Sequence, residues 1–177
     1  NSAFVDGFTH TFSGLTSLTY NGGPGGTNLS VSSASIPTTI NGGNGNDTFS
    51  LFNGSMVSNF TTNFTLNAGG GDDAMNLLGQ IDSSSGRYEF SNQTEFRFGP
   101  VNTPKILTYS GLEHATLQSS SAGDNIYVTQ APFELKILSG SGNDVVDITN
   151  IGGQVSTFPI TVNTGGENTS FGGGDDL

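Results

Sequence analysis

The sequence lacks three things that would mark common functional classes. It has no cysteine, only four basic residues against fifteen acidic ones, and no apolar run long enough to cross a membrane. Without cysteine there can be no disulfide framework or zinc–thiolate site. With so few Lys and Arg and a net charge of -11, we expect neither nucleic acid nor an anionic membrane surface as a partner, because phosphate binding needs basic patches. No membrane insertion is expected either.

A helical apolar stripe is also missing, whereas turn-forming residues are abundant. The chain contains 27 glycines among 177 residues, together with many Ser, Thr and Asn residues. These residue types disfavour helices and favour turns. A chain of this length can enclose one core, so the composition predicts a single all-β unit.

A glycine-rich segment that ends in an aspartate recurs along the chain. Clear copies run over residues 40–51, 66–77 and 137–148, and weaker copies run over 20–31 and 117–128. The position of the aspartate falls, in chain order, at Thr27, Asp47, Asp73, Asp124, Asp144 and Thr169. Successive positions are about 20–26 residues apart, except that Asp73 and Asp124 are separated by about two such intervals. Repeats of this length are typical of stacked architectures, and the double interval implies one unit without a recognisable motif.

Apolar residues alternate on both sides of each glycine turn. Leu135 and Ile137 precede one turn, and Val146 and Ile148 follow it. A spacing of two places such residues on one face of a strand. Two short strands cannot bury that face alone, so the copies must stack. The predicted fold is therefore an all-β parallel β-solenoid, similar to a β-helix or β-roll, with about 20–26 residues per turn.

A longer period, of about 97 residues, lies above this repeat. Thr27 corresponds to Asp124 and Asp47 to Asp144 at this offset, and residues 12–20 match 109–117 in the same way. We therefore expect one continuous solenoid over 1–177, with a first super-repeat at about 1–100 and a truncated second one at about 101–177. Because the chain starts without Met and ends within a glycine–aspartate run, we expect a fragment of a longer protein with neighbouring repeats.

Residues 87–98 alternate in the same way but have no glycine turn. They form either a degenerate turn of the solenoid or a hairpin that opposes Glu89 to Arg97. The hairpin would place four aromatic side chains on one face: Tyr88, Phe90, Phe96 and Phe98. That face belongs either to the core or to a carbohydrate-binding platform.

The carboxylates at the glycine turns suggest calcium. Calcium takes six to eight oxygen ligands and accepts carboxylates and backbone carbonyls together. Glycine reaches backbone angles that are closed to other residues, so a glycine-rich turn can direct several carbonyls inward. One turn supplies only part of a shell, and a stacked turn would complete it. On this reasoning Asp47 lies beside Asp73, and Asp124 lies beside Asp144.

The predicted metal site also includes polar residues and glycines around these four aspartates. The further candidates are Asn46, Asp72 and Asn143, each directly before an aspartate, and the turn residues Gly43, Gly45, Gly69, Gly71, Gly140 and Gly142. The alternative is that Asn, Asp and Gly make tight turns there without an ion. No metal is expected at the two turns that carry Thr27 and Thr169 in place of the aspartate.

Residues 42–50 resemble the Gly-Gly-x-Gly-x-Asp-x-apolar-x nonapeptide of hemolysin-type, or repeats-in-toxin, proteins. The copies that end at Asp73 and Asp144 match as well, with Ala68 and Ser139 in place of the first glycine. The resemblance implies a calcium-binding β-roll in a secreted or cell-attached protein. The family's nonapeptides follow one another directly, whereas this chain has one per turn. The wider pattern is similar to repeat regions of giant bacterial surface proteins.

The predicted function is non-enzymatic. We expect a calcium-stabilised repeat module of a secreted or cell-surface bacterial protein, such as an adhesin or surface layer, with a structural or presenting role. An extracellular location follows because low-affinity calcium sites stay empty in the cytosol. Surface glycans and other cell-surface proteins are further candidate partners. The alternatives are a carbohydrate-binding module and a polysaccharide-active enzyme on a β-helix, for which the sequence places no facing carboxylates together.

Overall fold

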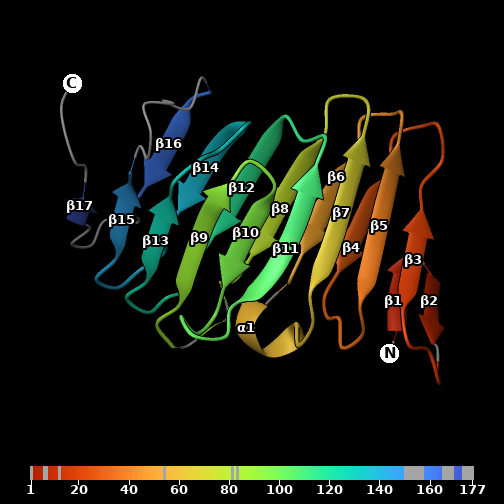
Figure 1. Cartoon of the computed structure of the whole chain (residues 1–177), viewed down its shortest axis with the longest axis horizontal. Helices are drawn as coiled ribbons and strands as arrows, with labels where there is room; N and C mark the ends of the chain where they lie inside the picture. The colour runs from red at the N-terminus through yellow and green to blue at the C-terminus, as the bar shows by residue number, and fades with distance from the viewer. Residues whose placement is uncertain are drawn as a thin grey trace.

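The computed structural model describes residues 2–5, 8–11, 13–53, 55–80, 82, 84–149, 158–164 and 170–172. Their strands form two sheets with one core between them (Figure 1). Sheet A contains, in spatial order, β16 (Ile160–Asn163), β14 (Glu134–Leu138), β12 (His114–Gln118), β8 (Ala74–Leu78), β6 (Thr48–Leu51), β4 (Asn28–Val31), β1 (Ser2–Val5) and β2 (Phe8–Thr11). Sheet B contains β17 (Ser170–Gly172), β15 (Val145–Ile148), β13 (Asn125–Val128), β9 (Arg87–Asn92), β10 (Glu95–Phe98), β11 (Lys105–Ser110), β7 (Phe64–Gly69), β5 (Thr38–Gly43) and β3 (Leu18–Asn21).

Most neighbouring strands are parallel and come from successive copies of the glycine-turn repeat. In sheet B, Leu18 of β3 lies opposite Thr38 of β5, and Thr38 in turn lies opposite Phe64 of β7. The strands between them, β4, β6 and β8, belong to sheet A. This alternation sends the apolar face of each strand into the shared core, where Phe49 of sheet A and Leu66 of sheet B are both fully buried.

Residues 87–110 depart from this arrangement. β9, β10 and β11 follow one another within sheet B, and β10 is antiparallel to both neighbours. The Asn92 side chain accepts hydrogen bonds from the backbone nitrogen and hydroxyl of Thr94, at 2.8 and 3.1 Å. Such a local side-chain bond favours a tight turn. The structure therefore has the hairpin arrangement of residues 87–98, with Glu89 opposite Arg97.

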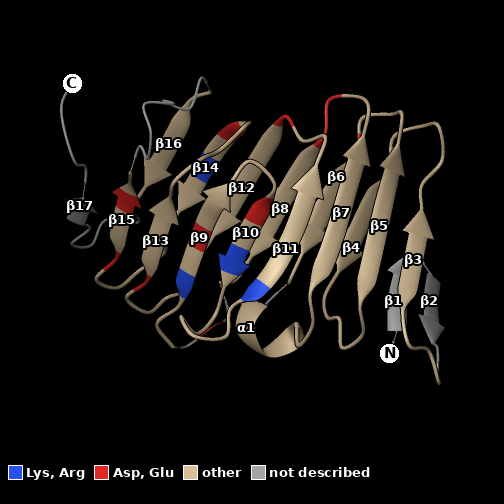
Figure 2. Cartoon of the chain, viewed as in Figure 1, with Lys and Arg blue, Asp and Glu red and all other residues tan. Residues whose placement is uncertain are grey.

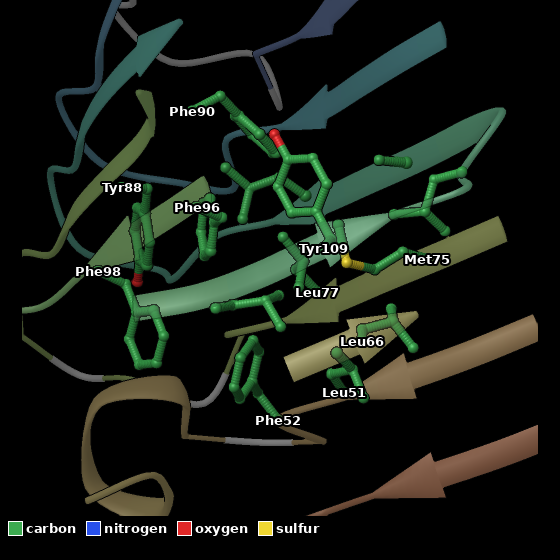
Figure 3. Packing of buried hydrophobic residues seen from close by; sticks show 14 of the residues in the cluster. Leu51, Phe52, Leu66, Met75, Leu77, Tyr88, Phe90, Phe96, Phe98 and Tyr109 are labelled. Carbon is green, nitrogen blue, oxygen red and sulfur yellow. The ribbon is translucent and has the colours of Figure 1, made fainter. Parts of the chain in front are cut away.

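The aromatic face of this hairpin lies in the core (Figure 3). The four rings, of Tyr88, Phe90, Phe96 and Phe98, are at most 2% exposed. The centroids of Phe90 and Phe96 are 4.8 Å apart, and those of Phe52 and Phe98 are 4.9 Å apart. Rings packed this closely stabilise the core. They are not accessible to a carbohydrate, so this face is not the binding platform considered above.

The predicted all-β parallel β-solenoid is wrong for this chain. Both sheets contain antiparallel pairs, because β1 is antiparallel to β2 and β4 in sheet A, as β10 is to its neighbours in sheet B. Phe64 of β7 pairs with Leu107 of β11. The two residues are farther apart in sequence than one short repeat, because the hairpin lies between β7 and β11 along the chain. The fold is therefore mostly β with mixed sheets.

A short helix, α1 (Met56–Asn59), also interrupts the β elements. Ser55 caps the helix by accepting a hydrogen bond from the Ser58 backbone nitrogen, and Asp82 accepts one from the Met56 backbone nitrogen at 2.9 Å. These caps satisfy helix donors that would otherwise lack partners. Within the described part of the chain, no helix is both long and apolar enough to span a membrane.

Strands that correspond to each other in the longer repeat of about 97 residues lie in opposite sheets. β5 of sheet B corresponds at this offset to β14 of sheet A, and β6 of sheet A corresponds to β15 of sheet B. Five strands, β8 to β12, lie between Asp73 and Asp124, where two regular repeats would have four, and this odd number places the later repeats in the opposite sheets. Consequently the glycine turns before the hairpin lead from sheet B to sheet A at one edge, and those after it lead from A to B at the opposite edge (Figure 1).

Candidate functional site

Carboxylates line up at the edge formed by the earlier glycine turns. Asp47 and Asp73 hold equivalent positions, because the strands that follow them, β6 and β8, pair in register. The Oδ1 atom of Asp47 accepts a hydrogen bond from the Thr27 backbone nitrogen at 2.5 Å, and Oδ1 of Asp73 accepts one from the Asp47 nitrogen at 2.7 Å. Glu113 then accepts from the Asp73 nitrogen at 2.9 Å. We call Asp47, Asp73 and Glu113 the first carboxylate column.

A second carboxylate column, formed by Asp124 and Asp144, lies at the opposite edge. Oδ1 of Asp124 accepts a hydrogen bond from the Gly86 backbone nitrogen at 2.6 Å, and Oδ1 of Asp144 accepts one from the Asp124 nitrogen at 2.9 Å. Oδ2 of Asp124 accepts from the nitrogen and hydroxyl of Ser120, both at 2.9 Å. The turn around Thr169, where no metal was expected, lies outside the described residues.

The four aspartates are buried, and three of them have an oxygen with no partner. None of the four is more than 1% exposed. The Oδ2 atoms of Asp47, Asp73 and Asp144 find no hydrogen bond among the residues that the structure describes. Burying an ionised carboxylate costs several kcal/mol unless its charge is paired or neutralised. Each column therefore needs a proton or a cation.

The pKa directions agree with this requirement. Burial raises the pKa of the Asp73 carboxyl above its usual range, against the hydrogen bond from the Asp47 backbone, and the negative charges of Asp47, Glu113 and Asp72 raise it further. Burial also raises the pKa of Asp124, against the hydrogen bonds that it accepts. At Asp73 and Asp124 the protein alone disfavours the ionised form.

The predicted glycines let successive turns stack in backbone contact. Gly69 has a φ angle of +109°, and a Cβ atom there would lie 1.9 Å from the Gly43 carbonyl oxygen. Gly140 has a φ angle of +85°, and its Cβ atom would lie 2.0 Å from the Ser120 carbonyl oxygen. No side chain fits at these positions. The φ angle is also positive at Gly43, Gly71 and Gly142, and a Cβ on Gly45 would lie 2.3 Å from the backbone nitrogen of Gly26.

The polar residues beside the aspartates do not join the columns. Asn46 accepts a hydrogen bond from the Asp72 backbone nitrogen at 3.0 Å, which links two turns. The Asp72 carboxylate lies 2.9 Å from Nε2 of His114 instead. Asn143 is exposed. Among the described residues, no three Asp, Glu or His side chains converge on one metal position.

Sequence reasoning missed Glu113 and the group around His114. Nδ1 of His114 lies 3.2 Å from Glu134, so the imidazole bridges Glu134 and Asp72. The three side chains are between 47% and 63% exposed, and ion pairs at such sites add little stability. His114 and Glu134 are one short repeat apart and pair in register, and this spacing is the one sequence signal that could have brought them together.

The columns nevertheless offer the donor chemistry of a hard divalent cation. All their ligand atoms are oxygens, and three of these oxygens are buried without a partner among the described residues. Since calcium takes six to eight oxygens, carbonyls of the glycine turns and water would have to supply the rest. With such additional oxygen ligands, the residues of the columns fit calcium. Comparison with known proteins gives no family, because no family model, no curated protein and no solved structure matches this chain.

Proposed function

We propose that this chain is a non-enzymatic repeat module of a secreted or cell-surface protein, and that calcium bound at the two carboxylate columns stabilises its folded form. The unpartnered, buried Oδ2 atoms of Asp47, Asp73 and Asp144 carry this proposal. Each belongs to a column in which another carboxylate lies one turn away. A divalent cation would give these oxygens a partner and cancel the repulsion between like charges.

The calcium would act through linkage. Binding to the folded chain alone raises the free energy of unfolding by RT ln(1 + [Ca]/Kd). With a Kd of about 10⁻⁴ to 10⁻³ M, which is typical of extracellular modules, 1 mM calcium contributes roughly 0.4 to 1.4 kcal/mol per ion. Cytosolic calcium is far below this range, so the stabilisation would appear only after export. The proposal therefore includes an extracellular or cell-surface location.

A ladder of amide side chains supports a structural role. Asn41 donates a hydrogen bond to Asn21 at 2.7 Å, and Asn67 donates one to Asn41 at 2.8 Å. Ser110 extends the ladder by donating to Asn67 at 3.2 Å. The ladder runs across four adjacent strands of sheet B on its outer face and ties each strand to the next. Such cross-strand bonds stiffen a sheet and suit a module that extends or presents other parts of a protein.

Thermal unfolding followed by circular dichroism tests the proposal. Excess EDTA, millimolar calcium and millimolar magnesium are compared for the wild type, for Asp47→Asn with Asp73→Asn, and for Asp124→Asn with Asp144→Asn. We expect a calcium-specific rise in midpoint that is reduced in each double variant. Asp147→Asn, which removes one carboxylate charge outside both columns, is the control and should keep the full rise. A wild-type midpoint that ignores calcium would refute the proposal and leave the aspartates as turn-forming residues.

A further inference from the structure

Three of the four basic residues of this acidic protein lie on three adjacent strands of sheet B. Arg87, Arg97 and Lys105 belong to β9, β10 and β11, which are adjacent in sheet B, and Figure 2 shows these basic positions close to one another. Lys136, the fourth, lies on β14 in the other sheet. In a chain with a net charge of -11, an acidic ligand is repelled by most of the surface and attracted here.

A pocket of about 210 Å³ opens at this surface. Its lining includes Arg87, Glu89 and Arg97 from the outer face of the hairpin and Gly99, Val101 and Pro104 from the segment that follows β10. The Gly99 backbone nitrogen donates a hydrogen bond to the Arg87 carbonyl at 3.1 Å, which ties this segment to β9. Val101 is 68% exposed at the pocket rim. The pocket thus combines charged groups with an apolar wall.

The two guanidinium groups are held in place before any ligand arrives. Arg87 is paired with Glu89 at 3.0 Å and lies 4.2 Å from the centre of the Tyr127 ring. Arg97 is paired with Glu95 at 2.9 Å. The Nε atom of Arg97 is buried and has no acceptor among the described residues. A buried donor without an acceptor is unfavourable, but a ligand in the pocket would meet the exposed part of the Arg97 side chain, which is 40% exposed as a whole.

The charge balance limits the kind of ligand. Arg87 and Arg97 are balanced by Glu89 and Glu95, and the Lys105 ammonium on the neighbouring strand donates a hydrogen bond to the Thr61 carbonyl at 3.1 Å. This balance suits one carboxylate rather than the closely spaced phosphates of a nucleic acid, which need several unpaired cations. Sugar hydroxyls both donate and accept hydrogen bonds, so they can use Glu89 and the guanidinium groups together. Val101 and Pro104 offer an apolar surface for the C–H face of a sugar ring.

We propose that this pocket binds a carboxylate-bearing saccharide, such as a uronic acid unit of an acidic polysaccharide. Arg97 and Arg87 bind the carboxylate, and Glu89 accepts hydrogen bonds from ring hydroxyls. Guanidinium groups suit this role because they present several N–H donors in a plane that matches a carboxylate. The pocket shares no residue with the carboxylate columns, so the proposal stands or falls separately from calcium binding.

Calorimetric titration with a galacturonic acid trisaccharide, at low salt and in millimolar calcium, tests this site. The matching neutral galactose trisaccharide and a short glutamate-rich peptide are the comparison ligands. We expect salt-sensitive binding of the acidic sugar and weaker binding of both comparison ligands. Arg97→Gln should weaken the affinity about tenfold or more, because it removes charge-assisted hydrogen bonds. Lys136→Gln removes the same charge from the opposite sheet and should leave the affinity within about twofold, as expected of a screened, distant charge.

Val101→Asp provides a second variant that leaves both arginines in place. The side chain is 68% exposed, so the fold tolerates the change, while the new carboxylate at the pocket rim repels an acidic ligand. We expect this variant to lose most of the binding. Unchanged affinity in both Arg97→Gln and Val101→Asp would refute the site. Equal binding of the neutral trisaccharide would refute carboxylate recognition, and equal binding of the peptide would refute recognition of the sugar.

Discussion

Replacing Asp73 by Asn separates the two roles that a column aspartate can have. Its Oδ1 atom accepts a hydrogen bond from the Asp47 backbone nitrogen at 2.7 Å, and its buried Oδ2 atom has no partner among the described residues. Asn keeps an oxygen acceptor for the Asp47 nitrogen but carries no charge. Ala keeps neither. The pair of variants therefore distinguishes a turn-forming acceptor from a cation ligand.

Without calcium, we expect the two substitutions to have different effects on the free energy of unfolding. Asp73→Ala leaves the Asp47 N–H without its acceptor in a buried position, which costs about 1–3 kcal/mol. Asp73→Asn preserves that bond and removes a charge that burial disfavours, since burial raises the pKa of Asp73. In EDTA we expect the Asn variant to be at least as stable as the wild type. In 1 mM calcium the wild type gains roughly 0.4 to 1.4 kcal/mol per ion, and the Asn variant gains less.

Urea unfolding in EDTA and in calcium measures both effects, and thermal midpoints provide a check. For a chain of this size, 1 kcal/mol corresponds to roughly 2–4 °C in Tm. If Asp73→Asn in EDTA is destabilised as much as Asp73→Ala, the argument from buried like charge is wrong. If Asp73→Asn keeps the whole calcium gain of the wild type, Asp73 is not a ligand and the first column does not bind the ion through it.

Three further predictions concern pH, a turn glycine and the helix cap. In EDTA, the urea concentration at the unfolding midpoint should rise as the pH falls. Asp73 and Asp124 have raised pKa values in the folded state, so the stability that their protonated forms contribute is lost as the pH increases through those values. A midpoint that falls throughout would contradict this. Gly69→Ala should lower Tm far more than Gly25→Ala, since a Cβ atom meets a carbonyl oxygen at 1.9 Å in the first case and nothing within 4 Å in the second; equal shifts would contradict backbone contact between turns. Asp82→Ala should cost about 1–2 kcal/mol as a lost helix cap and speed amide hydrogen exchange in α1, whereas unchanged exchange would show that the cap is dispensable.

The stacking of Asp47 beside Asp73, and of Asp124 beside Asp144, could be predicted from sequence because the interval between glycine turns sets the register. The step from Asp47 to Asp73 equals the offset between paired residues of β6 and β8. In the same way, the step from Asp124 to Asp144 equals the offset between paired residues of β13 and β15. The apolar alternation around each turn then decides which face is buried. These features are local and repeat, so a pattern in the sequence reveals them.

The choice between a solenoid turn and a hairpin at residues 87–98, and the end of the first column, could not be settled from the sequence because both depend on contacts that no motif marks. The apolar alternation of residues 87–98 is the same for a turn of a solenoid and for a hairpin. The chain reverses at a turn without glycine, where the Asn92 side chain accepts a hydrogen bond from the Thr94 backbone nitrogen. Glu113 lies far from Asp73 in sequence, and their contact follows only once the extra strands are known. Asp82 likewise caps α1 from a segment with no repeat signature.

The inserted hairpin also explains why the columns lie at opposite edges, and what they hold together. The first column reaches across the insertion, because the Asp73 nitrogen before the hairpin donates to Glu113 after it. The second column does the same at the other edge, where the Gly86 nitrogen before the hairpin donates to Asp124 after it. The segment between Gly86 and Glu113, which carries the arginine pocket, is therefore fixed at both ends by a carboxylate column. Because the columns share no residue, their contributions to stability should add, and weakening either one should loosen one end of the same segment.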